Sequence, residues 1–310
     1  MRSRSSSSPV SADRGGGPLR AIRDPLVVDL QSVLAAEPFD LAHAALIVAK
    51  VEHPDLNPAR SIDVLDGLGR EATRRLARVS GPSVRARIAV LNALIFEDEG
   101  FAGNHGHYDD YRNSLLNVVI ERRLGIPITL ALVYMEVARR AGLVVQSVSF
   151  PGHFLMRVPA LTLGADGEED EVLLDPFDRG AELDWADCRR LLNRHVGDEA
   201  PFDASLLRPC SRRHMLARML NNLKRTYVEM RSFPQARRVT DLLLAVDPMI
   251  LSELRDRGLL AYHLDDFPAA LRDLEDYLRL NQWKEESEAE ERDQVLDHIK
   301  ALRRRVAGLN

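Results

Sequence analysis

Residues 125–143, GIPITLALVYMEVARRAGL, constrain most strongly how this chain can fold. Pro127 suits the first position of a helix and Gly142 suits the position after its end, so the stretch predicts one helix. Its apolar residues cover most of the helical circumference. Because a helix that is apolar nearly all round is buried, the rest of the domain has to enclose it.

After this helix the pattern shifts towards the two-residue period of strands. The predicted strands are 144–150, 153–158 and 171–176. A hairpin between the last two, with its loop centred on Gly164, would place His153 opposite Asp175. Directly opposed residues share a face with their Cβ atoms about 5 Å apart. The sequence therefore predicts a histidine and an aspartate side by side at one end of a small antiparallel sheet.

Three further helices are predicted before the buried one. Asp40 is expected to cap the first, Ser61 to cap the second, and the third follows Pro82. Residues 97–114 are polar and interrupted by glycine, and they precede a short helix over residues 114–123. These helices are expected to act as a scaffold for the middle of the domain.

An internal repeat begins past residue 211. The pattern Phe-Pro-x-Ala at 233–236 recurs at 267–270, which gives a period of 34 residues. That period resembles the helix pairs of the tetratricopeptide repeat. Gly258 supplies a small residue of the pattern in the second unit, and Lys224 stands in its place in the first. A helix over 183–196 and an acidic-to-basic final helix are expected to cover the ends.

Composition and charge exclude several classes of function. The net charge is −5, and 38 of the 42 basic residues are arginine. The arginines are interleaved with carboxylates instead of forming one stripe, which disfavours a nucleic-acid partner. No stretch approaches the roughly 18 apolar residues of a membrane span, and the N-terminus lacks an apolar signal core. We therefore expect a soluble cytoplasmic protein with no nucleic-acid or membrane partner.

Two other features concern the tail and the cysteines. Residues 1–25 are rich in Ser, Gly, Pro and Arg, so a disordered tail is predicted. The two cysteines are too few for a disulfide-stapled scaffold or a zinc finger. Cys188 and Cys210 both follow the predicted His/Asp pair, and we expect them to be packing or surface thiols.

A buried helix followed by an antiparallel sheet with a His and then an Asp resembles the transglutaminase and thiol-protease superfamily. In that superfamily a cysteine begins the helix, where the helix dipole favours its thiolate, while the histidine acts as base and the aspartate orients it. The resemblance implies that His153 is the base and Asp175 the orienting acid. The matching nucleophile position is Pro127, which has no side chain able to attack a substrate.

A closer resemblance is to the SirB-type family of transglutaminase-like proteins with tetratricopeptide repeats. The matching strings are GFAGN (100–104), YRNSLLNVVIERRLGIPITLALVYMEVARRAGL (111–143), FPGHFLMR (150–157), LLDPF (173–177), RMLNNLK (218–224) and RDRGLL (255–260). The resemblance implies the same fold, and it implies that absence of the catalytic cysteine is a family trait. The family has no settled reaction to transfer.

Another residue could act as the nucleophile. Thr129, in the first turn of the buried helix, is the nearest hydroxyl, and Ser147 and Ser149 lie on the preceding strand. A threonine within a helix more often bonds back to a carbonyl. Loss of a triad nucleophile costs on the order of 10⁶ in turnover, so the sequence favours no catalysis. The alternative is a His153/Asp175 dyad that acts through water or a hydroxyl.

A metal site is a further alternative. His105, His107, Asp109 and Asp110 cluster in one loop, and such groups can ligate zinc or iron. No HExxH or CxxC spacing accompanies them. We therefore expect ordinary hydrogen-bonding groups here, with no metal and no other cofactor.

Three more residues are candidate binding residues. Asn113 and Asn117 lie four apart before the buried helix, so both could face a cleft. Asn113 is also a candidate N-cap that braces the loop. Tyr227, which the repeat aligns with Ala261, is the third candidate.

Together these observations predict an α+β fold, in which a transglutaminase/thiol-protease-like domain of helices and a small antiparallel sheet precedes all-α tetratricopeptide-like repeats. The predicted divisions are a tail at 1–25, the domain at 26–205, and the repeat region with its capping helix at 206–310. The favoured function is a non-catalytic module that binds a protein or peptide through its cleft and repeats. The alternative is a hydrolase or acyl transferase. The partner and the oligomeric state stay open.

Overall fold

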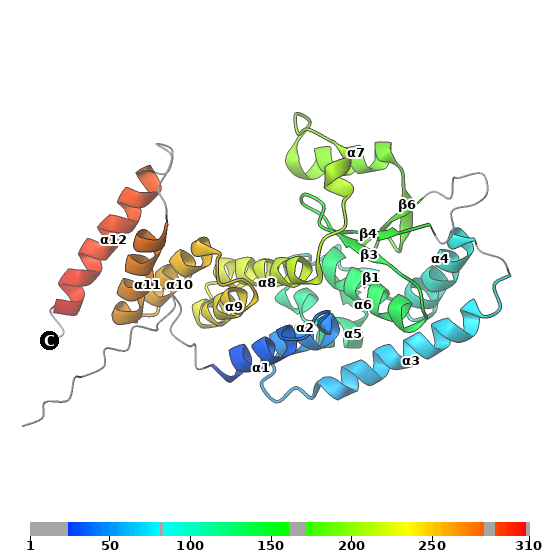
Figure 1. Ribbon diagram of the computed structural model, residues 1–310, viewed down its shortest axis with the longest axis horizontal. Coiled ribbons are helices and arrows are strands. Elements are labelled where there is room, and N and C mark those ends of the chain that lie inside the picture. The colour runs from blue at the N-terminus through cyan, green and yellow to red at the C-terminus, as the bar shows by residue number, and fades with distance from the viewer. Residues whose placement is uncertain (1–23, 81–82, 161–170, 282–288, 308–310) are drawn as a thin grey trace, which may run out of the picture.

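The computed structural model describes residues 24–80, 83–160, 171–281 and 289–307. Helices enclose a small four-stranded sheet, and the last helices extend away from it in a row that ends at α12 (Ala289–Ala307), as Figure 1 shows. The predicted α+β fold with a helical C-terminal region is confirmed. No helix among the described residues is long and apolar enough to cross a membrane.

The central helix is α6 (Pro127–Arg140), as the sequence predicts. Pro127 occupies its first turn, and Gly142 follows its end with a φ of 77°. Most of its side chains are fully enclosed, including that of Tyr134, which is 0% exposed. The all-round apolar pattern therefore does correspond to a buried helix.

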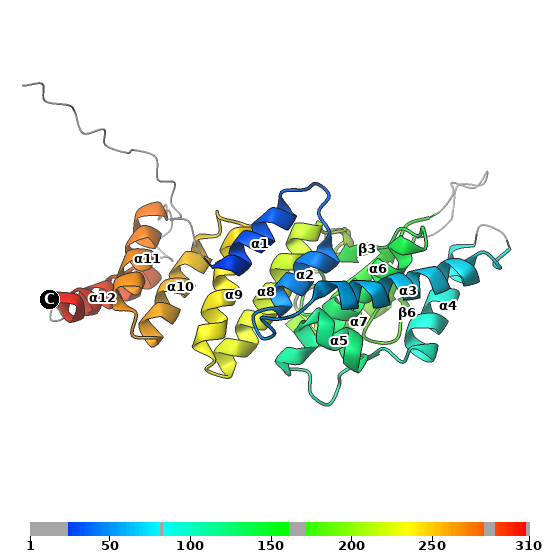
Figure 2. The ribbon, with the colours of Figure 1, turned by 90° about the horizontal axis from the view of Figure 1, so that it is seen from below.

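The helices before α6 are α1 (Pro25–Leu34), α2 (Leu41–Ala49), α3 (Pro58–Leu76) and α4 (Val84–Asn92), and a π-helix (Ala93–Asp98) continues α4. Asp40 caps α2 as predicted. The predicted start of α3 at Ser61 is wrong, because Asn57 caps the helix and Pro58 supplies its first residue. The helix α1 was not predicted from the sequence, and it lies alongside α9 in Figure 2. Residues 1–23 of the predicted tail lie outside the described residues.

The polar segment between α4 and α6 forms short elements. Strands β1 (Ala102–Gly103) and β2 (Leu124–Gly125) pair in parallel, and a 3₁₀ helix (Tyr111–Ser114) leads to α5 (Leu116–Arg122). The prediction that Asn113 is an N-cap is wrong. Asp110 caps the 3₁₀ helix by accepting a hydrogen bond from the Arg112 backbone N–H at 3.0 Å, and Asn113 lies inside that helix.

The sheet has the order β3 (Gln146–Val148), β4 (Leu155–Val158), β5 (Val172–Asp175) and β6 (Ala181–Leu183), all antiparallel. The predicted hairpin register between β4 and β5 is wrong by two residues, because Met156 pairs with Leu174 instead of residue 172. A shift of two preserves which side chains share a face. His153 precedes β4 in the turn after β3, and the predicted neighbourhood with Asp175 survives.

The C-terminal region consists of helix pairs. After α7 (Trp185–Val196) and a 3₁₀ helix (Ala204–Leu207) come α8 (Arg212–Glu229), α9 (Phe233–Val246), α10 (Leu251–His263) and α11 (Phe267–Leu280). The two repeat motifs begin α9 and α11. A Cβ added at Gly258 would lie 2.9 Å from Leu274, so α10 and α11 approach closely there.

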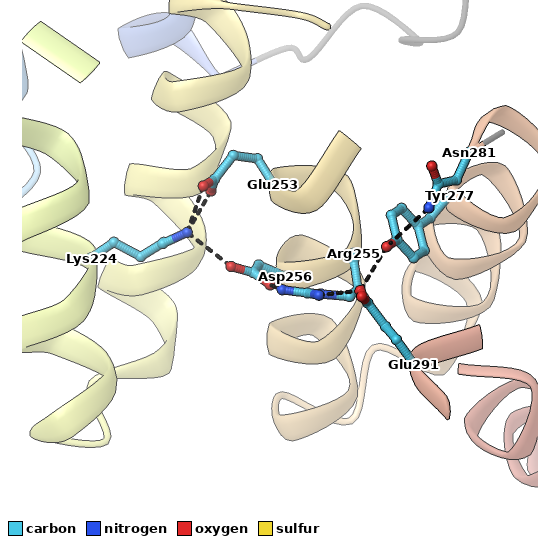
Figure 3. Close-up of polar contacts among 7 residues, drawn as sticks. All are labelled: Lys224, Glu253, Arg255, Asp256, Tyr277, Asn281 and Glu291. Atoms are coloured by element: carbon cyan, nitrogen blue, oxygen red, sulfur yellow. Dashed lines mark hydrogen bonds and ion pairs between the residues drawn. The ribbon is translucent and has the colours of Figure 1, made fainter. Parts of the chain in front are cut away.

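Lys224 occupies the glycine position of the first repeat and links the two repeats. Its Nζ lies 2.6 Å from Glu253 and 2.9 Å from Asp256, both on α10. Asp256 also accepts hydrogen bonds from Arg255, which pairs with Glu291 on α12 (Figure 3). This chain of charges runs from α8 to α12.

The hydrophobic core does not divide at residue 206. One cluster of buried side chains runs from α1 through α9 and includes Leu260 of α10, and a second is formed by other residues of α10 with α11 and α12. A third lies between the sheet and α7. The helices α8 and α9 therefore pack as part of the first domain. The boundaries 26–205 and 206–310 stay predictions about independent folding units.

Candidate functional site

A cleft of 460 Å³ lies where the sheet end, the start of α6, α7 and α8 meet. The lining residues are Tyr108, Asp109, Pro127, Ile128, Gly152, His153, Phe154, His195, Arg218, Asn222, Arg225 and Glu229. They come from five separate parts of the chain. The cleft is thus created by the way the elements pack.

His153 lines this cleft and is in direct contact with Asp175. The His153 Nε2 atom lies 2.9 Å from Asp175 Oδ1, and both residues are buried. Asp175 Oδ1 also accepts a hydrogen bond from the Phe177 backbone N–H at 2.8 Å. The carboxylate is therefore held in place and orients the imidazole, as an acid does for a base in a catalytic triad. The roles assigned to this pair stay predictions.

Pro127 lines the cleft at the start of α6, whereas Thr129 does not line it. The Thr129 side chain is 0% exposed, and its Oγ1 lies 2.8 Å from the Asn113 carbonyl oxygen and 3.0 Å from the Ile126 carbonyl oxygen. The same oxygen accepts a hydrogen bond from the Ile126 backbone N–H at 3.1 Å. Since the hydroxyl is used in local bonds, the geometry gives the predicted Thr129 nucleophile no support.

The two alternative serines are also held by other groups. Ser147 Oγ donates to the Cys210 carbonyl oxygen at 3.1 Å. Ser149 Oγ accepts a hydrogen bond from Arg218 at 2.7 Å and lies 3.0 Å from His214 Nε2. Neither serine lines the cleft.

His195 is a cleft residue that the sequence analysis did not identify. Its ring stacks on that of His153 with 5.6 Å between centroids and 19° between planes. Partial burial, and then the neighbouring His153, lower the pKa of His195 below its ordinary value of 6.5. The helix 183–196 was predicted only as a cover, because nothing in the sequence indicates that its last turn reaches the β3–β4 turn.

We expect His195 to titrate at a lower pH than a free histidine. Because its folded pKa is lowered, the unfolded chain binds more protons, and stability falls as the pH decreases from about 6.5 towards the folded pKa. Titration of the imidazole signals by NMR measures this pKa. The His153→Gln variant removes the neighbouring imidazole that helps to lower the pKa of His195, so this pKa should rise. An unchanged pKa would contradict the stacked arrangement of the two rings.

Gly152 allows the two histidines to approach each other. It has a φ of 68°, and a Cβ added there would lie 2.4 Å from the His195 Cβ. Gly142 provides a matched control, since its φ is 77° but an added Cβ would meet nothing within 4 Å.

We predict that Gly152→Ala destabilises the protein more than Gly142→Ala does. The control should lose about 1 kcal/mol from left-handed backbone strain alone, and Gly152→Ala should lose at least about 1 kcal/mol more. Urea unfolding measures both losses. In a His195→Gly background, which lacks the Cβ at position 195, the excess at position 152 should disappear. Equal losses for the two alanine variants would show that the contact has no energetic weight.

Phe177 connects the dyad to the GFAGN segment. Its ring lies 4.3 Å from that of His105 and 6.2 Å from that of His153, centroid to centroid. A Cβ added at Gly103 would lie 2.6 Å from this ring. Gly103, the second glycine of GFAGN, and Phe177 of LLDPF therefore pack against each other beside Asp175.

The candidate binding residues Asn113, Asn117 and Tyr227 do not line the cleft. Asn113 braces the loop, because its Nδ2 donates to the carbonyl oxygens of His107 and Tyr108 at 2.7 and 3.1 Å. Asn117 lines a separate groove of 980 Å³ beside the α2–α3 loop. Tyr227 is 1% exposed, and burial followed by Glu52 raises the pKa of its phenol. Their binding roles stay predictions, and none of the three residues lines this cleft.

The remaining candidates are the two thiols and the loop that contains His105, His107, Asp109 and Asp110. Burial raises the pKa of Cys188 to about 11 and raises that of Cys210 as well. Within the described ranges, no group of three or more His, Cys, Asp or Glu side chains is placed to hold a metal ion.

Comparison with known proteins identifies the family. The transglutaminase-like superfamily matches residues 60–221, more than half of the chain, and a tetratricopeptide repeat matches residues 223–304. A UPF0162 protein of Xylella fastidiosa strain Temecula1 is 40% identical over 248 residues, covering 79% of this chain and 85% of that protein. Protein SirB1 of Salmonella typhimurium is 28% identical over 184 residues, which cover 59% of this chain and 66% of the SirB1 chain. The chain belongs to the SirB-type family of transglutaminase-like proteins.

This chain is also similar to longer proteins. F-box only protein 21 of Homo sapiens is 31% identical over 186 residues, which cover 57% of this SirB-type chain and 28% of that protein. The match to both a transglutaminase-like and a tetratricopeptide family agrees with the predicted architecture. These two families suggest a role in protein interaction.

Proposed function

We propose that this SirB-type protein is a non-catalytic transglutaminase-like protein that binds a protein or peptide partner in the cleft beside His153. The observation that carries the proposal is that Pro127 lines the cleft at the position where the superfamily has its nucleophile. A proline has no group that can form a covalent intermediate. The retained His153–Asp175 pair then serves as a rigid polar wall.

The composition of the cleft supports a peptide as the bound molecule. Tyr108, Phe154 and two arginines line it, and aromatic residues and arginine are enriched on surfaces that bind proteins. Asn222 and other residues of α8 contribute one wall, and α8 also begins the helical repeats, a class of structure commonly used for recognition. A partner seated in the cleft could therefore extend along the repeats. We also propose a cytoplasmic location, which is consistent with the two free cysteines.

A displayed library of random peptides tests the proposal. We expect the full-length protein to select peptides that bind with a measurable dissociation constant in fluorescence anisotropy. Asn222→Trp, which places a large side chain in the cleft, should abolish this binding. Asn221→Trp is the matched control, because Asn221 is exposed on the same helix and does not line the cleft. The proposal fails if no peptide is selected, or if both variants bind equally.

The alternative is a hydrolase or acyl transferase in which His153 activates water or a hydroxyl. The buried and oriented His153–Asp175 pair is the observation in its favour. Mass spectrometry of the selected peptides after incubation separates the two functions. Intact peptides support the binding module. Cleavage or modification that is lost in a folded His153→Ala variant would instead establish the enzyme.

A further inference from the structure

Arg218 is a cation in the cleft whose bonds go to neutral oxygens. Its Nη1 donates to Ser149 Oγ at 2.7 Å, and its Nη2 donates to the His153 carbonyl oxygen at 2.5 Å. Its guanidinium carbon lies 5.6 Å from the centre of the Phe154 ring. In the part of the chain that the structure describes, no carboxylate pairs with it within 4.0 Å. Two of its five N–H groups are therefore used, and three are left.

Other enclosed arginines have carboxylate partners. Arg140 pairs with Asp66 at 2.6 Å, and Arg257 pairs with Asp273 at 2.7 Å. At the rim of the cleft, Arg225 lies 3.8 Å from Glu229. Burial lowers the pKa of Arg218, and the groups that act in the opposite direction, Cys210 and Tyr108, are not carboxylates. Removing a charge from water without a counter-charge is costly, so the site favours a ligand that brings one.

We propose that Arg218 binds a carboxylate of the partner peptide. This inference rests on the proposed function, since it names the chemical group that the cleft recognises. An arginine fork suits a carboxylate because two N–H groups can donate to its two oxygens. Asn222 lies four residues further along α8 and also lines the cleft, so both side chains face the ligand together. The bound carboxylate lies beside the His153 turn, to which Arg218 is already bonded.

The carboxylate has two possible sources, the C-terminus of the peptide or an Asp or Glu side chain. Each selected peptide is synthesised in four forms that combine a free or amidated C-terminus with acidic residues kept or replaced by Asn and Gln. On the wild-type protein, we expect one of the two neutralisations to weaken binding about 10- to 100-fold, as loss of a charge-assisted hydrogen bond does. The form that loses affinity identifies the source.

Variants then assign the effect to Arg218. In Arg218→Gln the charged and neutral peptides should bind with equal affinity, and Arg218→Lys should retain part of the difference. Arg190→Gln is the control for net charge, because Arg190 is exposed on α7 and pairs with Asp187, three residues before it on the same helix. A purely structural role for Arg218 would weaken all four peptides alike and preserve their differences.

Two outcomes overturn the inference and leave the proposed function standing. One is that the fully neutral peptide binds the wild-type protein as tightly as the charged one. The other is that the difference between peptides persists in Arg218→Gln. Should Arg218→Gln fail to fold by circular dichroism, the four peptides on the wild-type protein still decide the first point. Failure to select any peptide would refute the proposed function itself.

Discussion

A cysteine introduced at position 127 should be more reactive than an ordinary thiol. Pro127→Cys places the thiol at the first turn of α6, in the cleft that also contains His153. A helix N-terminus and a neighbouring imidazole both favour the thiolate, so we expect a pKa below the ordinary 8.5. At pH 6 its rate of alkylation by iodoacetamide should exceed that of a reference thiol by about tenfold or more.

The two native cysteines should not interfere with this measurement. Burial raises the pKa of both Cys188 and Cys210, so neither should react appreciably at that pH. Ser32→Cys provides the reference, because Ser32 is exposed on α1. Adding His153→Ala to Pro127→Cys should move the thiol pKa back towards 8.5. If the introduced thiol has a pKa of 8.5 and this value does not change when His153→Ala is added, the His153–Asp175 pair is not aligned with position 127.

Removal of Arg257 should have the largest effect on the stability of the repeat region. This α10 residue lies 3.2 Å from Asp241 on α9 and donates to both oxygens of Asp273 on α11 at 2.7 and 2.8 Å. All three side chains are largely enclosed. Breaking such a cluster leaves uncompensated buried charge, so Arg257→Ala should cost about 3 kcal/mol in urea unfolding. Arg279→Ala, at an exposed pair on the same helix as Asp273, should cost less than about 0.5 kcal/mol.

The loss in Arg257→Ala should depend on pH. Burial raises the pKa of Asp241 above 3.8 even though Arg257 opposes the shift, and without Arg257 it should rise further. A carboxyl whose folded pKa is raised destabilises the fold as the pH increases from the unfolded value through the folded one. The difference between wild type and variant should therefore be larger at pH 7 than at pH 4. A difference that does not change with pH would contradict a charged cluster.

The elements predicted best from the sequence were those with strong local patterns. The helix α6 was predicted from its all-round apolar residues, and the two repeat motifs at Phe233 and Phe267 mark the starts of α9 and α11. Short elements were predicted less well. Strands β1, β2 and β6 have two or three residues each, too few for a period to be recognised.

The candidate site was predicted in part for the same reason. The two-residue error in the hairpin register leaves the face of Asp175 unchanged, and His153, in the turn before β4, still contacts it. His195 and Arg218, which line the cleft, and Phe177, whose ring contacts that of His153, were not identified, since each is positioned by the packing of a separate element. No local signal in the sequence indicates those contacts.

By itself, the sequence determined that a helix begun by Pro127 is buried and that a histidine and an aspartate follow it and lie close together at one end of a small sheet. These properties depend on residue type and spacing along one segment. Only the tertiary structure decided that α8 packs into the first domain and brings Arg218 to the His153 turn, and that α7 stacks His195 on the same histidine. Such contacts depend on how elements far apart in the chain pack against a common core. Burial of apolar surface is favourable but not directional, so the spacing of residues along one segment does not determine which surfaces meet. The cleft follows from that arrangement.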